Sequence, residues 1–387
     1  MHVSGLRINN ERAVLTAVAT QPGRSAAQIA RATGLGPQSV MRILAEQEQA
    51  ELILKGEVIR GQRGQPATPI TLNPDGAFII GCEIGWRHAY IMLRNFTGGI
   101  LAEHHRTYRF PDAFAIIEEI GAMARQFAGR LSDLQRSRLL GMGLAMPSGI
   151  GRNIDLFGAP PEQAAAWNAM DIPAAAAAAS GIEVFPFNDG NAACWAELAA
   201  HPPPRPANMA YFYVGTAVGA GLIAEGRLWE GPTGNSANLG SMLITDRNGR
   251  PEFVHLVASI LALERRLVEA GLTSPGPNLA EWDWNALEPV VGPWLEDAAH
   301  ALAHAIINTY AVMEFSVALV DGAMPRPLVE RLVAAVQRQV QLLPTLTADR
   351  PVVQIGRLGP TAAARGAALK PIYRRFYSPE RSDMTGR

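Results

Sequence analysis

Apolar residues recur at helical spacing in three short segments near the start of the chain. In residues 10–22, Val14, Leu15 and Val18 form one apolar stripe. A second helix is predicted to end at Gly34 and a third to begin near Pro37, because glycine often closes a helix and proline fits its first turn. The pattern therefore predicts three helices, with a tight turn between the second and the third.

Two β-rich runs follow these helices, at residues 51–59 and 68–73, on either side of a glycine-rich tip. Three helices and such a hairpin are typical of a winged helix-turn-helix, and residues 1–72 carry eight Arg or Lys against five Asp or Glu. The module is predicted to bind DNA, and a protein-interaction module is the alternative. The residues predicted to contact DNA are Gln38, Ser39, Met41 and Arg42 in the third helix, and Arg60 and Arg63 at the tip.

The rest of the chain repeats one plan twice. A strand, a glycine-containing turn and a second strand begin at Phe78, and the same arrangement begins again at Ala210. Each copy is followed by amphipathic helices and further apolar strands. This pattern predicts an internally duplicated α/β body with a cleft between two lobes, residues 73–190 and residues 191–387, the second including a C-terminal helix.

Composition narrows the class of protein. Of 387 residues, 48% are hydrophobic and 18% charged, which excludes wholesale disorder, and a net charge of −1 argues against coating nucleic acid along the whole chain. Two cysteines, Cys82 and Cys194, exclude a disulfide framework and a four-cysteine zinc site. His300 and His304, four apart on one helix, are a weak metal candidate. Glycines interrupt the longest charge-poor stretch and no signal-peptide core is visible, so a cytoplasmic protein without a membrane partner is expected.

Several motifs, in order along the chain, resemble those of the ROK family of repressors and sugar kinases. After the N-terminal module come GMGLAMPSGI from Gly141, FNDGNAACWAELA from Phe187, GTAVGAGLI from Gly215 and GPTGNSANLG from Gly231. The resemblance implies a two-lobed actin-like (ribonuclease H-like) sugar-kinase body. Long N-terminal winged modules mark the family's repressor branch, which implies operator DNA and a small carbohydrate effector as partners.

Asn188 and Asp189 end an apolar strand and open a helix, which is where ligands usually bind in an α/β sheet. In the family's kinases the matching Asp takes the proton of the attacking sugar hydroxyl and the Asn contacts the sugar; an Asp that caps its helix is the alternative. Asn238, Ser241 and His255 stand where the resemblance places a sugar-binding Glu, His and Glu. All five are predicted to contact a ligand, and for His255 a buried structural role is equally open.

The phosphate-binding side departs from the kinase pattern. The resemblance implies an acidic residue, two glycines and a hydroxyl in the first turn, whereas this chain has Glu83, Gly85, Trp86 and Arg87. The indole of Trp86 opposes the close approach that backbone amides need to bind phosphate. The family's cysteine-rich zinc loop is replaced by a segment without cysteine, RPEFVHLVAS. No metal, no cofactor and no ATP-dependent phosphorylation are expected, and Asp189 is interpreted as a vestigial base.

Together these observations predict a homo-oligomeric, sugar-responsive transcription regulator, most simply a repressor of carbohydrate catabolism genes. A dimer or tetramer is expected, because one recognition helix reads only a few base pairs. Ligand in the cleft would change the spacing of the DNA-binding modules. Two alternatives remain. One is an active sugar or amino-sugar kinase with a DNA module attached, favoured by Asp189 and opposed by Trp86; the other is a regulator controlled by a protein partner.

Overall fold

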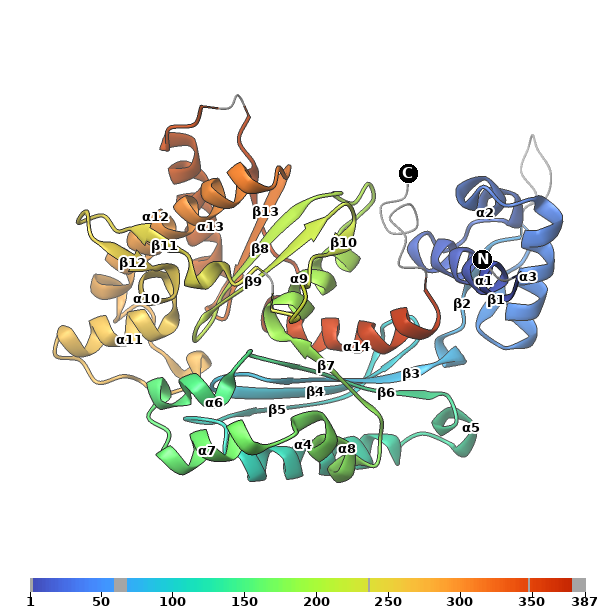
Figure 1. Cartoon of the computed structure of the whole chain (residues 1–387), viewed down its shortest axis with the longest axis horizontal. Coiled ribbons are helices and arrows are strands. Elements are labelled where there is room, and N and C mark those ends of the chain that lie inside the picture. The colour runs from blue at the N-terminus through green and yellow to red at the C-terminus, as the bar shows by residue number, and fades with distance from the viewer. Residues whose placement is uncertain (1–2, 59–67, 236, 347–348, 378–387) are drawn as a thin grey trace.

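The computed structural model describes residues 3–58, 68–235, 237–346 and 349–377, and Arg60 and Arg63 lie outside these ranges. Figure 1 shows an N-terminal group of helices at one end and two α/β lobes at the other, with a C-terminal helix running between them. No helix among the described residues is long and apolar enough to cross a bilayer.

The N-terminal module contains the three predicted helices and a small antiparallel sheet. The turn between the second and third helices runs through Gly34, whose φ of 70° suits glycine, to Pro37 in the first turn of the third helix. The sheet pairs Ile53 with Leu72 and Lys55 with Ile70. The elements are α1 (Val3–Thr20), α2 (Ala26–Thr33), α3 (Pro37–Gln49), β1 (Ile53–Lys55) and β2 (Ile70–Leu72).

Helix α3 has one buried and one exposed face. Val40, Ile43 and Leu44 are buried against the other two helices. The opposite face, made of Gln38, Ser39, Met41 and Arg42 and called here the α3 face, is exposed, and 56% of the Met41 surface is accessible. The helical pattern of buried and exposed positions therefore places the four predicted DNA-contacting residues of α3 together on the outside of the molecule.

The first lobe is built on a five-stranded sheet with the order β5-β4-β3-β6-β7. The β3–β4 and β4–β5 pairs are antiparallel, and the β3–β6 and β6–β7 pairs are parallel. The outer face of the sheet packs on α4 (Ala113–Ala128) and α8 (Ile172–Ser180). The strands are β3 (Phe78–Ile84), β4 (His88–Asn95), β5 (Ile100–Thr107), β6 (Leu139–Met146) and β7 (Val184–Asn188), and the shorter helices are α5 (Asp133–Arg136), α6 (Ile150–Asn153) and α7 (Pro161–Ala169).

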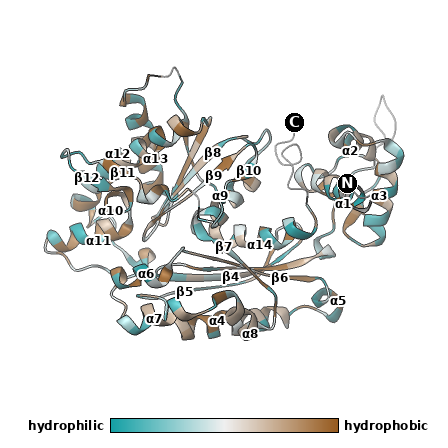
Figure 2. Ribbon diagram, in the orientation of Figure 1, coloured by the Kyte–Doolittle hydropathy of each residue, from teal (hydrophilic) through white to brown (hydrophobic). Residues whose placement is uncertain are grey.

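The second lobe repeats this topology with the order β10-β9-β8-β13-β14. One face of its sheet packs on α12 (Glu288–Val312) and α13 (Arg326–Leu342), and the other on α9 (Asp189–Ala200). Figure 2 shows hydrophobic positions in brown along these strands and on the helices around them. The predicted duplication is thus confirmed in the order and direction of all five strands. They are β8 (Met209–Val214), β9 (Val218–Ala224), β10 (Arg227–Leu228), β13 (Val317–Gly322) and β14 (Val352–Ile355).

Two details differ from the sequence interpretation. A lobe boundary after residue 190 falls inside α9, which packs on β9 of the second lobe. The C-terminal helix α14 (Ala362–Arg375), assigned to the second lobe, also packs on β3 and β6 of the first. The amphipathic helices predicted after the second copy begin with α10 (Val254–Ala258) and α11 (Ile260–Glu269), which are separate because Ser259 is extended and caps α11 by accepting the Ala262 N–H.

Helix α14 packs between the two lobes at three positions where glycine is required. A Cβ on Gly81 of β3 would overlap the Ala364 carbonyl, and one on Gly143 of β6 would overlap that of Ala367. On the other side, a Cβ on Gly366 would overlap the Ala192 carbonyl of α9. Backbone therefore packs directly on backbone on both sides of α14, which fixes the helix to both lobes.

The N-terminal module shares its core with the body. Val14 and Val18 of α1 belong to one buried apolar cluster with Ile79, Phe96 and Ile372. The Arg12 guanidinium donates to the Arg374 carbonyl at 2.9 Å, close to the end of α14. The module is thus joined to the body by packing as well as by the chain.

Candidate functional site

A cleft of about 630 Å³ lies between the lobes, within the range of cavities that hold small molecules. The carboxyl end of β7 and the β3–β4 turn line it from the first lobe, and the β8–β9 turn and α10 from the second. The start of α14 closes its floor at Ala362 and Ala363. All five residues predicted to contact a ligand line this one cleft: Asn188, Asp189, Asn238, Ser241 and His255.

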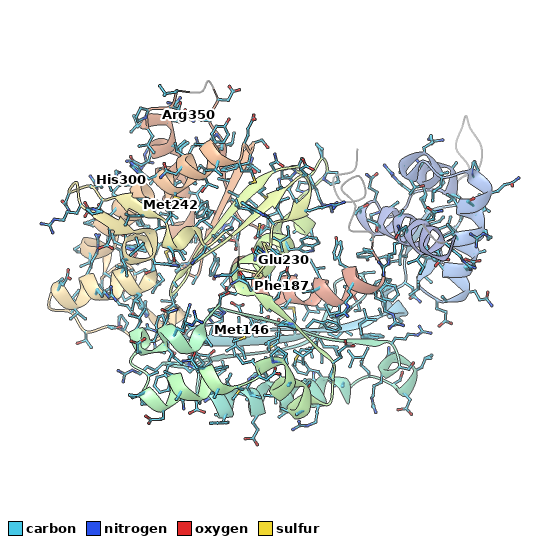
Figure 3. All side chains as sticks on the ribbon, viewed as in Figure 1. Met146, Phe187, Glu230, Met242, His300 and Arg350 are labelled. Carbon is cyan, nitrogen blue, oxygen red and sulfur yellow. The ribbon has the colours of Figure 1, made fainter. Side chains whose placement is uncertain are left out.

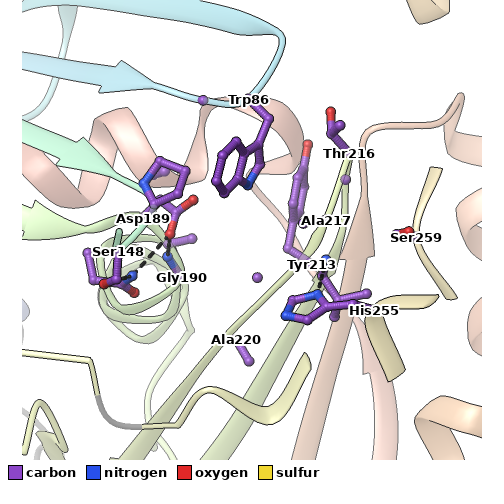
Figure 4. Close-up of a pocket in the computed structure, with 18 of the residues that line it drawn as sticks. Trp86, Ser148, Asp189, Gly190, Tyr213, Thr216, Ala217, Ala220, His255 and Ser259 are labelled. Carbon is purple, nitrogen blue, oxygen red and sulfur yellow. Dashed lines mark hydrogen bonds between the residues drawn. The ribbon is translucent and has the colours of Figure 1, made fainter. Parts of the chain in front are cut away.

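Asn188, and not Asp189, caps helix α9. Its side-chain oxygen accepts the Asn191 N–H at 3.0 Å, and its amide donates to Ser148 Oγ at 3.1 Å. Asp189 uses Oδ1 to accept the Gly190 N–H at 2.8 Å, and its Oδ2 has no hydrogen bond to any described residue. Because capping is provided by its neighbour, the Asp189 carboxyl keeps one oxygen for a ligand, as seen in Figure 4.

Burial and a second carboxyl change the acidity of Asp189. Burial raises the pKa of this carboxyl to about 6, and the nearby negative charge of Glu83 acts in the same direction. The Gly190 N–H and His88 oppose the shift. The group is therefore poised to exchange a proton near neutral pH, a property that suits both a general base and a switchable hydrogen-bond partner.

Glu83 and His88 form a polar pair beside Asp189. Glu83 ends β3 and His88 begins β4, and His88 Nε2 lies 3.2 Å from Glu83 Oε1. Burial disfavours the charged imidazole, but the Glu83 carboxylate outweighs it and the pKa of His88 is raised. Glu83 Oε2 is buried and has no partner among the described residues. That oxygen is free to accept a hydrogen bond from a ligand hydroxyl.

His255 combines a structural and a site-facing role. Its Nδ1 accepts the Val218 N–H at 3.0 Å, which leaves the proton of the neutral ring on Nε2. Burial lowers the pKa of His255 to about 4, so the ring stays neutral at physiological pH. A Cβ on Gly240 would overlap this ring, which explains the glycine there. His255 lines the cleft and can donate one hydrogen bond to a ligand.

The β3–β4 turn carries Trp86 and Arg87, each with a defined partner. The Trp86 indole stacks on Phe157 with ring centroids 4.6 Å apart, and both rings line the cleft. Arg87 forms an ion pair with Glu264 of α11, which joins the two lobes across the cleft. A stacked indole and a neutralised arginine thus occupy the turn from which an ATP-binding site would need glycine amides.

Comparison with known proteins places this architecture in a family. The model of the ROK family matches residues 79–370. The chain belongs to the ROK family. It is 23% identical to the xylose repressor of Bacillus spizizenii over 62% of this chain and 61% of that protein.

Two solved structures of ROK proteins share the fold. A transcriptional regulator described as a homologue of the E. coli MLC protein has a TM-score of 0.66 and 18% identity, covering 98% of this chain and 97% of that one. A glucokinase from Streptomyces griseus, in complex with glucose and AMPPNP, has a TM-score of 0.58 and 18% identity, covering 76% of this chain and 98% of that one. The N-terminal module precedes residues 79–370, which the ROK model matches, and it packs on that matched region.

Several residues of this ROK cleft were not singled out from the sequence as ligand contacts. Ser148 lies two residues after the end of β6, and Asn188 is the last residue of β7, so the position of Ser148 at the carboxyl end of a parallel strand was an available signal. His88 and Phe157 gave no such signal, because their position depends on how separate segments pack.

The histidine pair on α12 is satisfied by the backbone. His300 Nε2 lies 2.9 Å from the Thr245 carbonyl, and His304 Nδ1 lies 2.9 Å from the His300 carbonyl. Within the described part of the chain, no group of three or more His, Cys, Asp or Glu residues is arranged to hold a metal ion. These two histidines therefore have a structural explanation in their hydrogen bonds.

The ion pair between Arg87 and Glu264 is expected to contribute strongly to stability. Only 16% and 7% of these side chains are exposed, so Arg87→Ala leaves a buried carboxylate uncompensated and should lower the free energy of unfolding by about 3 kcal/mol or more. Denaturant unfolding measures the change. Arg106→Ala is a matched control, because the Arg106 side chain is 51% exposed beside Glu119 and an exposed pair contributes ~0–1 kcal/mol. Equal losses in the two variants would contradict a special role for Arg87.

Proposed function

We propose that this protein is a sugar-responsive DNA-binding regulator, acting as a repressor without kinase activity and assembled as a homo-oligomer. The observation that carries the proposal is helix α14, which begins at the cleft and ends at the N-terminal module. Ala362 and Ala363 line the cleft, while Ile372 lies in the same apolar cluster as α1. A ligand that displaces the first turn of α14 therefore acts on the module through one rigid element.

The segment that leads into α14 is held by buried carboxylates from the second lobe. Glu197 of α9 accepts the N–H groups of Arg357 and Leu358 at 2.9–3.0 Å, and Asp321 of β13 accepts the Gly359 N–H at 3.0 Å. These bonds make the beginning of the helix follow any movement of the second lobe. Closure of the lobes around a ligand then moves α14 with them.

Further along α14, two contacts join it to both lobes. Lys370 Nζ lies 3.1 Å from Glu230 Oε1, just beyond β10, and 4.1 Å from the centre of the Phe187 ring of β7. Figure 3 shows Glu230 and Phe187 beside the helix at the centre of the molecule. A change in lobe spacing strains or breaks one of these contacts, which supports α14 as the element that reports the state of the cleft.

The N-terminal module supports DNA as the partner. The α3 face offers an amide, a hydroxyl, an apolar side chain and a guanidinium at the start of a helix, which are groups that read base edges in a major groove. Arg42 is paired with Glu46 at 2.7 Å, and both side chains are largely exposed. A DNA phosphate or base can therefore replace Glu46 as the partner of Arg42 at a small cost in free energy, because an exposed ion pair is weak.

The proposal is tested first with DNA. The full chain is used to select binding sites from a random double-stranded library, and operator affinity is then measured with and without a panel of carbohydrates. Arg42→Ala should weaken operator binding by about 1–3 kcal/mol and leave the melting temperature unchanged, because its side chain lies on the α3 face. Arg227→Ala, an exposed arginine on β10, is the control and should bind normally.

Failure to enrich any sequence, or equal affinity in Arg42→Ala and the parent protein, would contradict the assignment of α3. If a DNA sequence is enriched but no carbohydrate releases the protein from it, DNA binding is supported and the ligand response is contradicted.

Kinase activity is the second candidate function, because Asp189 keeps a free carboxylate oxygen at a helix N-terminus.

A further inference from the structure

Polar and aromatic side chains both line the cleft. Asn188, Asp189 and the neutral His255 offer hydrogen-bond donors and acceptors. Trp86, Phe157 and Tyr213 present aromatic rings. In the view of Figure 4, Trp86 lies between Asp189 on one side and Tyr213 with His255 on the other. A single sugar ring bound at Asn188 and Asp189 therefore has the indole of Trp86 as its neighbour in the cleft.

Trp86 is held in a fixed orientation. Phe157 is itself 95% buried and stacks against the indole with an angle of 28° between the rings. Phe157 thereby covers one face of the indole. Trp86 is half-buried, and the uncovered part of its ring lines the cleft. A rigid aromatic face that is already ordered binds the apolar side of a ring without loss of side-chain freedom.

Exposed apolar side chains also line the cleft. Leu156 of the first lobe is 50% exposed, and Phe253 and Leu256 of the second are 46% and 37% exposed. These side chains come from different lobes, so closing the lobes on a ligand would bury them together. Their presence on both lobes favours an occupant that extends beyond a single ring bound at Asn188 and Asp189.

The charges of the cleft favour a neutral occupant. Glu83 and Asp189 are carboxylates, and Arg87 is already paired with Glu264. Among the described lining residues, Arg265 is the one permanently cationic side chain, and it is exposed on α11. His88 is buried and its pKa is raised, but it is already paired with Glu83. A phosphate or carboxylate placed beside Asp189 would therefore meet like charge without an unpaired buried cation to offset it.

We infer that the effector is a neutral two-ring glycoside: its glycosyl ring binds at Asn188 and Asp189, and its second ring, sugar or aryl, stacks on Trp86. This inference rests on the proposed carbohydrate response and specifies its ligand. A disaccharide and an aryl glycoside share this chemistry, because each presents an apolar ring face next to a glycosidic oxygen.

Calorimetry with matched ligands tests the inference. For glucose, galactose, mannose and xylose, the methyl glycoside is compared with the phenyl glycoside of the same anomer and with a disaccharide that carries the same glycosyl unit. In the parent protein, the recognised sugar should bind at least ~10-fold more tightly in one two-ring form than as the methyl glycoside. If the phenyl glycoside alone gains, the second ring is an aglycone; if the disaccharide gains, it is a sugar.

The variants test whether Trp86 provides this preference. Trp86→Ala should reduce the ratio of the two dissociation constants to about one, and Trp86→Phe should keep part of it because a ring remains. Trp229→Ala, a 46% exposed tryptophan outside the cleft lining, should keep the parent ratio. Melting temperatures show whether Trp86→Ala is folded. If it is not, the ratio of dissociation constants in Trp86→Phe decides whether Trp86 provides the preference.

Each outcome has a separate meaning. A methyl glycoside that binds as tightly as both two-ring forms would overturn the inference and leave the proposed carbohydrate response standing. A two-ring preference that persists in Trp86→Ala would also overturn it. Tighter binding of the glycosyl phosphate than of either two-ring form would contradict the neutral ligand. Binding of none of these compounds would contradict the proposed response itself.

Discussion

Replacing Gly366 with alanine is expected to destabilise the protein by about 3 kcal/mol, the upper end of the usual cost of overpacking a core. The added Cβ would overlap the Ala192 carbonyl of α9, and a backbone group cannot turn aside as a side chain can. In an exposed helix the same change would stabilise by ~1 kcal/mol, so the overlap and the helix propensity predict opposite signs. Denaturant unfolding followed by circular dichroism measures the result.

Gly292→Ala is the matched control. Gly292 lies in helix α12, where the nearest atom to an added Cβ is Oε1 of Glu288, the far end of a flexible side chain at 3.0 Å. This variant should be as stable as the parent or slightly more stable. A Gly366→Ala protein that matches Gly292→Ala would show that α14 is not confined between the lobes. Helix α14 would then not be the rigid connection from the cleft to the module.

Local patterns are sufficient to predict most of the elements and part of the cleft lining. Helical spacing predicts α3, in which Val40, Ile43 and Leu44 are buried, because these contacts lie within one short module. The repeated strand–turn–strand segments predicted two equivalent sheets. Asn188 and Asp189 could be found because the carboxyl end of a parallel strand is where side chains meet a ligand.

What the sequence could not provide depends on contacts between distant segments. Arg87 meets Glu264 across 177 residues, and nothing near either residue indicates the other. From the sequence, Trp86 is a side chain that opposes phosphate binding. The structure adds that it stacks on Phe157 and forms part of the cleft lining. The double packing of α14 also depends on three separate glycines, Gly81, Gly143 and Gly366, which become meaningful only when the two sheets are placed side by side.

Asp189→Asn is expected to abolish the release of operator DNA by carbohydrate while leaving operator affinity without ligand unchanged. A carboxylate can accept hydrogen bonds through both oxygens, and Oδ2 of Asp189 is unpartnered among the described residues. The amide replaces one acceptor with a donor, so a ligand hydroxyl that donates to Asp189 meets an N–H instead. The α3 face lies on the N-terminal module, far along the chain from this change, and its exposed residues keep their surroundings.

Two measurements on the parent protein and on Asp189→Asn separate a sensing carboxylate from a catalytic one. Operator affinity is determined with and without the carbohydrate that binds, and ATP turnover is measured with the same compound. A variant that still releases DNA would contradict the sensing role of Asp189. Turnover of about 1–100 per second in the parent, lost in the variant, would instead establish a kinase. We expect no turnover in either protein, because Trp86 and Arg87 occupy the turn from which glycine amides would contact phosphate, and a variant that binds DNA but no longer responds to sugar.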